Sequence, residues 1–131
     1  VKGSESDDGI LTAGEVAKLK LNAEWVILSA CNTAAADGTP GAEGLSGLAK
    51  AFFYAGSRAL LVSHWPVASD AAVKLTTRAF AELAKPAGIG RAEAMRRSML
   101  ALMADEERPF YAHPMFWAPF IVVGEGGRQR Q

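Results

Sequence analysis

Short blocks of apolar residues separated by polar or glycine-bearing stretches predict an alternation of strands and helices. Three runs of bulky or β-branched residues predict strands, at Trp25–Leu28, Ala59–Val62 and Phe120–Val123. The first two lack the apolar–polar alternation of a half-exposed strand, which is typical of strands that are buried on both faces. Gly124 closes the third run.

Local signals place two helices in the first half of the chain. Thr12 and Glu15 have the spacing of a capping box, which predicts a short helix over residues 13–21. Apolar residues at helical spacing predict a second helix over residues 45–53, and Gly56 is well placed to end it in the left-handed conformation.

Two further helices are expected between the second and third strands. Ser69 and Asp70 are predicted to cap the first, and Pro86–Gly90 separates it from the second. Both are expected to face a core. The positions assigned to that core are Val73, Thr76, Thr77, Phe80 and Leu83 in the first helix and Met95, Met99, Leu102 and Met103 in the second.

The strand, loop, helix and strand between residues 25 and 63 form a βαβ unit, whose strands are expected to be parallel. The sequence therefore predicts an α/β layer fold with helices on both faces of a mostly parallel sheet. Three strands make a thin buried sheet, and the chain begins with Val1 and a polar stretch. We therefore expect a fragment whose missing strands precede Val1 or come from a partner. It should expose apolar surface and self-associate, and residues 125–131 should fray.

Composition bounds the class of protein. The chain has 131 residues, enough for one domain, and its 50% hydrophobic and 21% charged residues suit a globular protein. Fourteen basic residues balance fourteen acidic ones, so no net charge attracts nucleic acid or an anionic membrane. The apolar runs are too short to span a bilayer and no signal peptide is evident, which favours a cytoplasmic protein.

The chain has a single cysteine, Cys31, which has no partner for an internal disulfide and lacks the spacing of a zinc site. It is expected at the carboxyl end of the first strand, where ligands gather in open parallel sheets. The stretch from Asn32 to Gly44, thirteen residues of loop composition, follows at once. A connection of this length favours a binding or active site.

A free thiol has a pKa of about 8.5, so nucleophilic chemistry at Cys31 would need a base nearby. His64 follows the neighbouring strand and could approach the thiol at the same sheet edge. The alternatives are that Cys31 is an inert buried residue, that His64 orders a turn, and that His113 serves packing and hydrogen bonding. Glu43 and Asp70 could be explained by helix capping alone.

Four segments, distributed along the chain from Asp8 to Gly124, carry a family resemblance. They are DGILT (Asp8–Thr12), WVILSACNT (Trp25–Thr33), GAEGLSGLAKAFFYAGSRALLVSHWPV (Gly41–Val67) and HPMFWAPFIVVG (His113–Gly124). In this order they resemble the C-terminal part of a CHAT domain, a caspase-like cysteine peptidase family often fused to tetratricopeptide repeats. The resemblance implies that residues 1–131 are the C-terminal part of one caspase-like domain.

The resemblance implies that Cys31 is the nucleophile and that its backbone N–H helps to hold the oxyanion. The family's dyad histidine lies in an upstream His-Gly pair, which this sequence does not contain. Ser29 stands where wider relatives line the pocket for the substrate side chain before the scissile bond. Being small and uncharged, it supplies neither the carboxylate expected for a basic side chain nor the long polar chain of caspases. Asn32, Glu43 and Gly44 are expected to contact the substrate.

The sequence thus predicts a cysteine endopeptidase domain that acts on a protein partner, with fused repeats in the full-length chain and no cofactor or metal. The fragment alone is expected to be inactive. Ala68 stands where many relatives carry an acidic residue after the WPV turn, which removes any role of that acid here. The rival hypothesis is a non-catalytic interaction or regulatory module with the same scaffold.

Overall fold

The computed structural model describes residues 11–28 and 45–127. Four α-helices, two 3-10 helices and three strands lie in these ranges. In chain order they are α1 (Ala13–Lys18), β1 (Val26–Ile27), α2 (Leu45–Tyr54), β2 (Ala59–Ser63), α3 (Ser69–Leu83), α4 (Arg91–Met103), η1 (Pro109–Ala112), η2 (Pro114–Phe116) and β3 (Phe120–Gly124).

The described strands form one mixed sheet in the order β1-β2-β3. β1 runs parallel to β2, with Val26 beside Leu60 and Ile27 beside Leu61, as the βαβ pattern predicts. β3 runs antiparallel to β2, with Ser63 beside Phe120. The expectation of a mostly parallel sheet therefore holds for one of the two pairings, and the described sheet is mixed.

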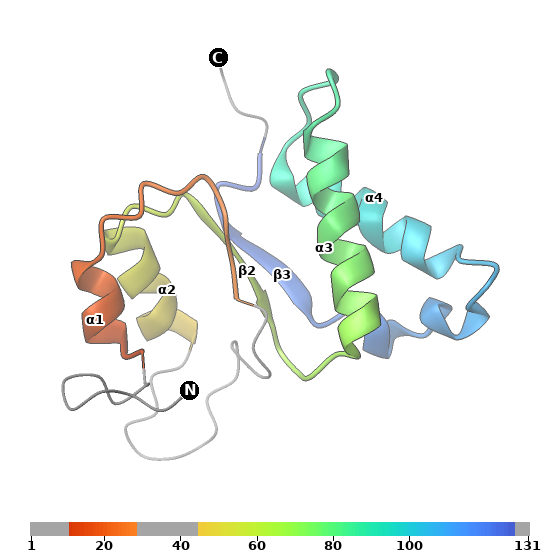
Figure 1. Cartoon of the computed structure of the whole chain (residues 1–131), viewed down its shortest axis with the longest axis horizontal. Helices are drawn as coiled ribbons and strands as arrows, with labels where there is room; N and C mark the ends of the chain where they lie inside the picture. The colour runs from red at the N-terminus through yellow and green to blue at the C-terminus, as the bar shows by residue number, and fades with distance from the viewer. Residues whose placement is uncertain (1–10, 29–44, 128–131) are drawn as a thin grey trace.

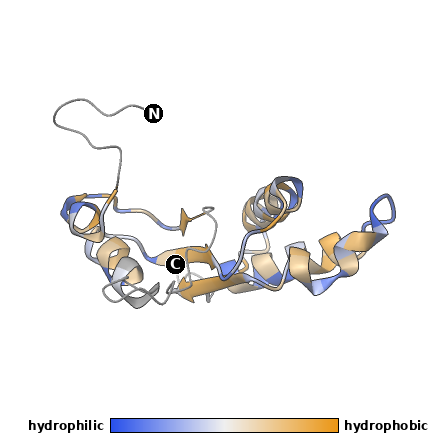
Figure 2. Cartoon of the chain, turned by 90° about the horizontal axis from the view of Figure 1, so that it is seen from below, coloured by the Kyte–Doolittle hydropathy of each residue, from blue (hydrophilic) through white to orange (hydrophobic). Residues whose placement is uncertain are grey.

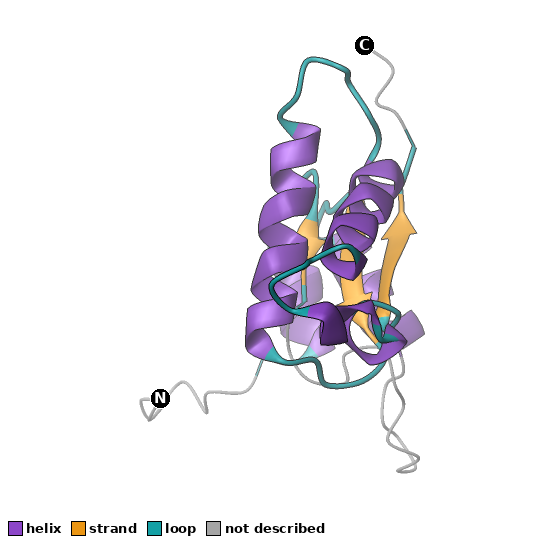
Figure 3. Cartoon of the chain, turned by 90° about the vertical axis from the view of Figure 1, so that its right-hand side faces the viewer, coloured by secondary structure: helices purple, strands orange, loops and turns teal. Residues whose placement is uncertain are grey.

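Helices cover both faces of the sheet, as predicted (Figure 1). Alternate side chains of β2 point to opposite faces. Leu60 and Val62 pack with α1 and α2 on one face, whereas Leu61 packs with α3, α4 and Tyr111 on the other. Figure 3 shows α3 and α4 lying over the strands, and Figure 2 shows the strands of the sheet as an apolar layer between the two helical layers.

Local signals account for two helix boundaries. Thr12 and Glu15 form the predicted capping box, in which the Glu15 backbone N–H donates to Thr12 Oγ1 and the Thr12 backbone N–H donates to Glu15 Oε2. The helix ends at Lys18, earlier than expected. Gly56 follows α2 with a φ of +97°, a conformation that favours glycine, so its predicted role as a helix stop is confirmed.

The buried stripe of α3 differs from the predicted one. Ala71, Leu75 and Ala79 face the sheet, whereas Val73 and Phe80 are 61% and 49% exposed. Leu75 and the two alanines share one face of the helix at i, i+4 and i+8 spacing, which leaves Val73 and Phe80 outside the buried stripe. Val73 and Phe80 belong to the apolar surface on which the predicted self-association would rest.

Three other expectations are corrected. Met103 is exposed, although Met95 and Leu102 of α4 are buried as predicted. Ser69 begins α3 without capping it, since the N-cap residue is Ala68 and makes no side-chain cap. The residues of the first predicted strand, Trp25–Leu28, are half-buried because β1 lies at the edge of the described sheet.

The start of the tail is held in place. Arg91 Nη1 donates to the carbonyl oxygen of Glu125 at 2.9 Å, and the Ala92 backbone N–H donates to the carbonyl oxygen of Gly126 at 2.9 Å. Glu125 and Gly126, which belong to the tail expected to fray, are therefore hydrogen-bonded to the start of α4. Residues 128–131 lie outside the described ranges.

Replacing Leu61 by alanine tests the central position of β2. Because Leu61 is buried against α3 and Tyr111, we expect Leu61→Ala to lower the free energy of unfolding by about 2–5 kcal/mol. Urea denaturation followed by circular dichroism measures this. Tyr54→Ala is the matched control, since Tyr54 is 82% exposed and should change stability by less than about 0.5 kcal/mol. Equal losses in the two variants would contradict the central role of β2.

Candidate active site

The carboxyl ends of β1 and β2 meet at one edge of the sheet because these strands are parallel. β2 ends at Ser63, His64 follows it, and α3 begins at Ser69. In Figure 1 this is the lower edge, where α2 and α3 also begin. Helix N-termini carry partial positive charge, so this edge is electrostatically suited to a thiolate or an oxyanion.

The site residues predicted from the sequence lie outside the described residues. They are Cys31, Ser29, Asn32, Glu43 and Gly44. The last described residue before them is Leu28, whose backbone N–H donates to the carbonyl oxygen of Leu61 at 2.9 Å. The roles of these five residues stay predictions.

His64 is exposed at the end of β2. Its backbone N–H donates to the carbonyl oxygen of Pro119 at 3.0 Å, just before β3 begins. This bond extends the β2–β3 pairing by one step and joins the turn after β2 to the segment before β3. Because this bond is made by the backbone, it orders the turn without the imidazole, and the role of the His64 side chain stays a prediction.

A second bond holds the same turn. The indole N–H of Trp65 donates to the carbonyl oxygen of Met115 at 3.1 Å, which fixes the ring although it remains 40% exposed. Residues 64–68 therefore form a strap that is tied to the 113–119 segment from two successive residues. His113 contributes to that segment, because its Nδ1 accepts from the Met115 backbone N–H at 3.2 Å. The predicted hydrogen-bonding role of His113 is confirmed.

Asp70, in the first turn of α3, anchors the other end of the strap. Its Oδ1 accepts from the Ala71 backbone N–H at 2.9 Å, which is a local contact at the helix start. Its Oδ2 accepts from the Tyr111 hydroxyl and pairs with the Arg108 guanidinium. Arg108 Nη1 also lies 2.9 Å from the Tyr111 hydroxyl oxygen, so the three groups form a closed network.

Tyr111 is fully buried and joins this network to the core. Its ring lies 5.3 Å from that of Phe116 and 4.7 Å from that of Phe110, measured between centroids. Lys74, which pairs with Asp105, lies over the same ring at 5.3 Å from the centroid. The aromatic packing fixes the position of the hydroxyl, and the hydroxyl fixes Asp70.

The network changes the ionisation of its members. The hydrogen bond from Tyr111 lowers the pKa of Asp70, and the Ala71 backbone N–H and the charge of Arg108 lower it further. The same hydrogen bond raises the pKa of Tyr111, because the hydroxyl proton is held by a carboxylate. Asp70 is thus ionised and Tyr111 protonated at neutral pH.

Sequence reasoning missed this network. Asp70 had an adequate explanation as a capping residue, and the sequence analysis assigned no role to Tyr111 or Arg108. The partners are 38 and 41 residues apart in the sequence, and no local spacing connects them.

Neither a metal-binding cluster nor a membrane-spanning helix is found in the part of the chain that the structure describes. No group of three or more His, Cys, Asp or Glu side chains in residues 11–28 and 45–127 could hold a metal ion. Within the same residues, no helix is long and apolar enough to cross a membrane.

Comparison with known proteins identifies related sequences. The profile described as "CHAT domain" matches residues 1–125. The chain is 33% identical to Tetratricopeptide repeat protein 28 of Mus musculus over 120 residues and 29% identical to the Homo sapiens protein of that name over 115 residues. Each match covers 88% of this chain and 4% of the relative. No solved structure matches the chain.

The ionisation of Asp70 predicts a pH dependence of stability. Its pKa in the folded chain lies below the ordinary value of 3.8, so its contribution is present above that value and is lost as the pH falls through the folded pKa. We expect Asp70→Asn to be less stable than the wild type at pH 7, with the difference shrinking below about pH 4. Urea unfolding at several pH values measures this. Glu106→Gln, in an exposed position, is the control, and a difference that does not depend on pH would contradict the assigned ionisation.

Proposed function

The chain belongs to the CHAT domain family, and from this membership we propose that it forms part of a caspase-like cysteine endopeptidase domain with Cys31 as its nucleophile. The observation that carries the proposal is the place of the cysteine in the chain. It follows β1, which is parallel to β2, three residues after the last described residue, Leu28. If the pairing continues, the thiol reaches the edge at which His64 stands and α3 begins.

The proposed reaction is hydrolysis of a peptide bond. The Cys31 thiolate attacks the carbonyl carbon, and the resulting oxyanion is held by backbone N–H groups, among them that of Cys31. A histidine donates a proton to the leaving amine as the carbon–nitrogen bond breaks, which leaves a thioester. Water, activated by the same histidine, then hydrolyses the thioester and releases the acid and the thiolate.

We assign the dyad histidine to polypeptide that precedes Val1. The sequence holds two histidines, and neither stands in a His-Gly pair. The turn that carries His64 is tied to Pro119 and Met115, which supports a role of this segment as a wall of the site. His113 already accepts a hydrogen bond through Nδ1.

Ser29, Asn32, Glu43 and Gly44 are proposed to line the substrate pocket. The strap of residues 64–68 would form the neighbouring wall, with Trp65 held in place by Met115. Asp70, Arg108 and Tyr111 support this wall from behind and do not take part in the chemistry.

The proposed substrate or regulator is a protein. Its selection would fall to repeats elsewhere in the polypeptide, since the named relatives are tetratricopeptide repeat proteins and the chain spans about 4% of their length. The cytoplasm is the proposed location, because reducing conditions there keep a lone thiol free.

A non-catalytic interaction or regulatory module is the second candidate. In such a module the same scaffold would bind proteins without cleaving them. The ionisation of Cys31 distinguishes the two functions.

The rate of Cys31 alkylation by iodoacetamide as a function of pH tests the proposal, and the single cysteine makes the signal unambiguous. In the 131-residue chain we expect an ordinary thiol with a pKa of about 8.5. In a longer chain that includes the preceding residues, the apparent pKa should fall to about 6–7, and replacing the restored histidine by alanine should abolish the shift.

An unshifted thiol in the longer chain would favour the binding module. Rapid alkylation of the 131-residue chain at neutral pH, lost in His64→Ala, would instead identify His64 as the base. His113→Ala is the matched control, since the His113 side chain caps η2 by accepting a hydrogen bond from the Met115 backbone N–H.

A further inference from the structure

Helices α3 and α4 enclose a groove of about 490 Å³ on the surface of the molecule. Thr77 and Ala81 of α3 and Ala101 and Leu102 of α4 line it. Thr77 and Ala81 are exposed, while Leu75 and Ala79 of the same helix face the sheet, so the groove opens to solvent. Thr77, Ala81 and Ala101 have small side chains, so the backbone of a partner could approach closely at these positions. The rest of the lining consists of Val73, Lys74, Arg78, Ser98, Leu102 and Asp105.

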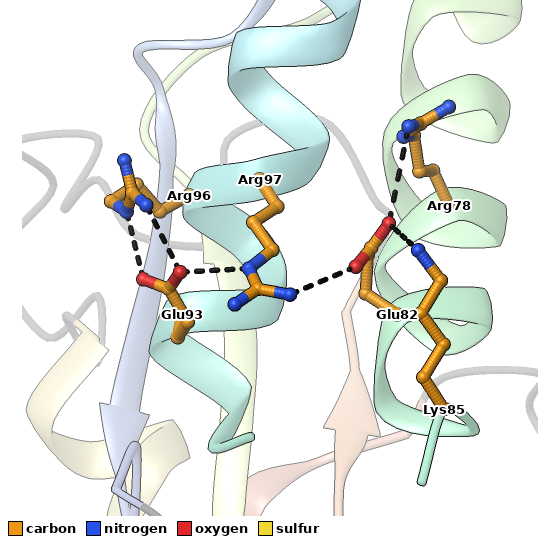
Figure 4. Close-up of polar contacts among 6 residues, drawn as sticks. All are labelled: Arg78, Glu82, Lys85, Glu93, Arg96 and Arg97. Atoms are coloured by element: carbon orange, nitrogen blue, oxygen red, sulfur yellow. Dashed lines mark hydrogen bonds and ion pairs between the residues drawn. The ribbon is translucent and has the colours of Figure 1, made fainter. Parts of the chain in front are cut away.

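Charged side chains of α3 and α4 form a cluster that adjoins this groove through Arg78, and Figure 4 shows the contacts within the cluster. The carboxylate of Glu82, only 4% exposed, lies 2.6 Å from Lys85 Nζ, 3.5 Å from Arg97 Nη1 and 3.9 Å from Arg78 Nη2. Glu93 pairs with Arg96 at 2.7 Å and with Arg97 at 2.8 Å. Arg78 also lines the groove, which makes the cluster and the groove continuous.

The cluster presents a surplus of positive charge to solvent. Four cations, Arg78, Lys85, Arg96 and Arg97, surround two carboxylates, which leaves a net charge of +2. The cationic side chains are 40–61% exposed, whereas Glu82 is buried among them. The surplus is local, since the whole chain has no net charge.

Both carboxylates of the cluster, Glu82 and Glu93, are ionised near neutral pH. The hydrogen bonds from Arg96 and Arg97 lower the pKa of Glu93 to about 2. The hydrogen bond from Lys85 lowers the pKa of Glu82, and Arg97 lowers it further. The charge pattern therefore stays constant over the pH range in which binding would be measured.

We propose that the α3–α4 groove is a docking site for an acidic amphipathic helix of a partner protein. Apolar side chains of that helix would enter the hollow between Ala81 and Ala101, and its Asp or Glu side chains would face Arg78 and Arg97. Thr77 and Ala81 lie one turn apart, about 6 Å along α3, which matches the spacing of side chains on the face of an incoming helix.

The lining favours a peptide over single-stranded nucleic acid. Nucleic-acid grooves of this kind offer aromatic rings on which bases stack. The residues that line this groove include no aromatic side chain. The inference does not depend on the proposed peptidase chemistry, because no lining residue belongs to the strap of residues 64–68. The groove also adjoins the Tyr111 network through Lys74, which lies over the Tyr111 ring and pairs with Asp105.

The test uses the 131-residue chain and a fluorescent synthetic helix with leucine and alanine on one face and glutamate on the other. Fluorescence anisotropy should show saturable binding that weakens with added salt. Arg78→Glu should weaken binding at least about tenfold, a change of ~1.4 kcal/mol. Lys50→Glu is the matched control, since it makes the same charge change on α2 and should alter affinity by less than about twofold.

A second variant distinguishes binding in the groove from non-specific attraction between opposite charges. Ala81→Arg adds a positive charge but fills the hollow, so the proposal predicts weaker binding where electrostatics alone predicts stronger binding. Ala81 is exposed on a helix and arginine is a good helix former, so the variant should fold, and circular dichroism checks this.

Four results would overturn the proposal. They are the absence of saturable binding by the acidic helix, equal losses in Arg78→Glu and Lys50→Glu, undiminished binding by Ala81→Arg, and tighter binding of a single-stranded oligonucleotide than of the peptide.

Discussion

Strand β2 is enclosed on every side by the rest of the described structure. All five of its residues are buried, and it pairs with β1 along one edge and β3 along the other. Leu60 and Val62 meet one helical layer, and Leu61 meets the other. A strand that is buried on both faces and paired on both edges fixes the register of its neighbours, because a slip by one residue would exchange the two faces.

That register determines where the candidate active site can form. β1 enters the sheet parallel to β2, so the two strands end at the same edge of the sheet. The same edge is closed by hydrogen bonds from His64 and Trp65 to the 113–119 segment and by the network of Asp70, Arg108 and Tyr111. β2 thus positions the 64–68 turn, and under the proposed function Cys31 would stand beside that turn.

Local patterns in the sequence were sufficient for the helices and for the parallel pair. The capping box of Thr12 and Glu15 and the stop at Gly56 depend on residues close together in the chain. The antiparallel direction of β3 could not be predicted from local patterns of this kind. The chain after α4 turns back through η1 and η2, and Pro119 meets the end of β2 at His64, so β3 begins where β2 finishes.

Contacts between distant residues limited the prediction of the site. Tyr111 meets Asp70 across 41 positions, and the core face of α3 is formed by Leu75 with two alanines, Ala71 and Ala79, and not by Val73 and Phe80. The predicted nucleophile and its pocket residues depend on family resemblance and lie in residues 29–44, outside the described ranges. The proposed chemistry therefore depends on one feature of the described fold, the edge of the sheet at which β1 and β2 end.

The most direct test of that link is a distance measurement from the only cysteine. A nitroxide attached to Cys31 broadens the NMR signals of nearby protons, and the label can be compared with its reduced, diamagnetic form. The account predicts broadening of the His64 backbone N–H and the Trp65 indole N–H, with Gly88 and Gly90 at the opposite end of α3 unaffected. Broadening at Gly88 and Gly90 without broadening at His64 would contradict it.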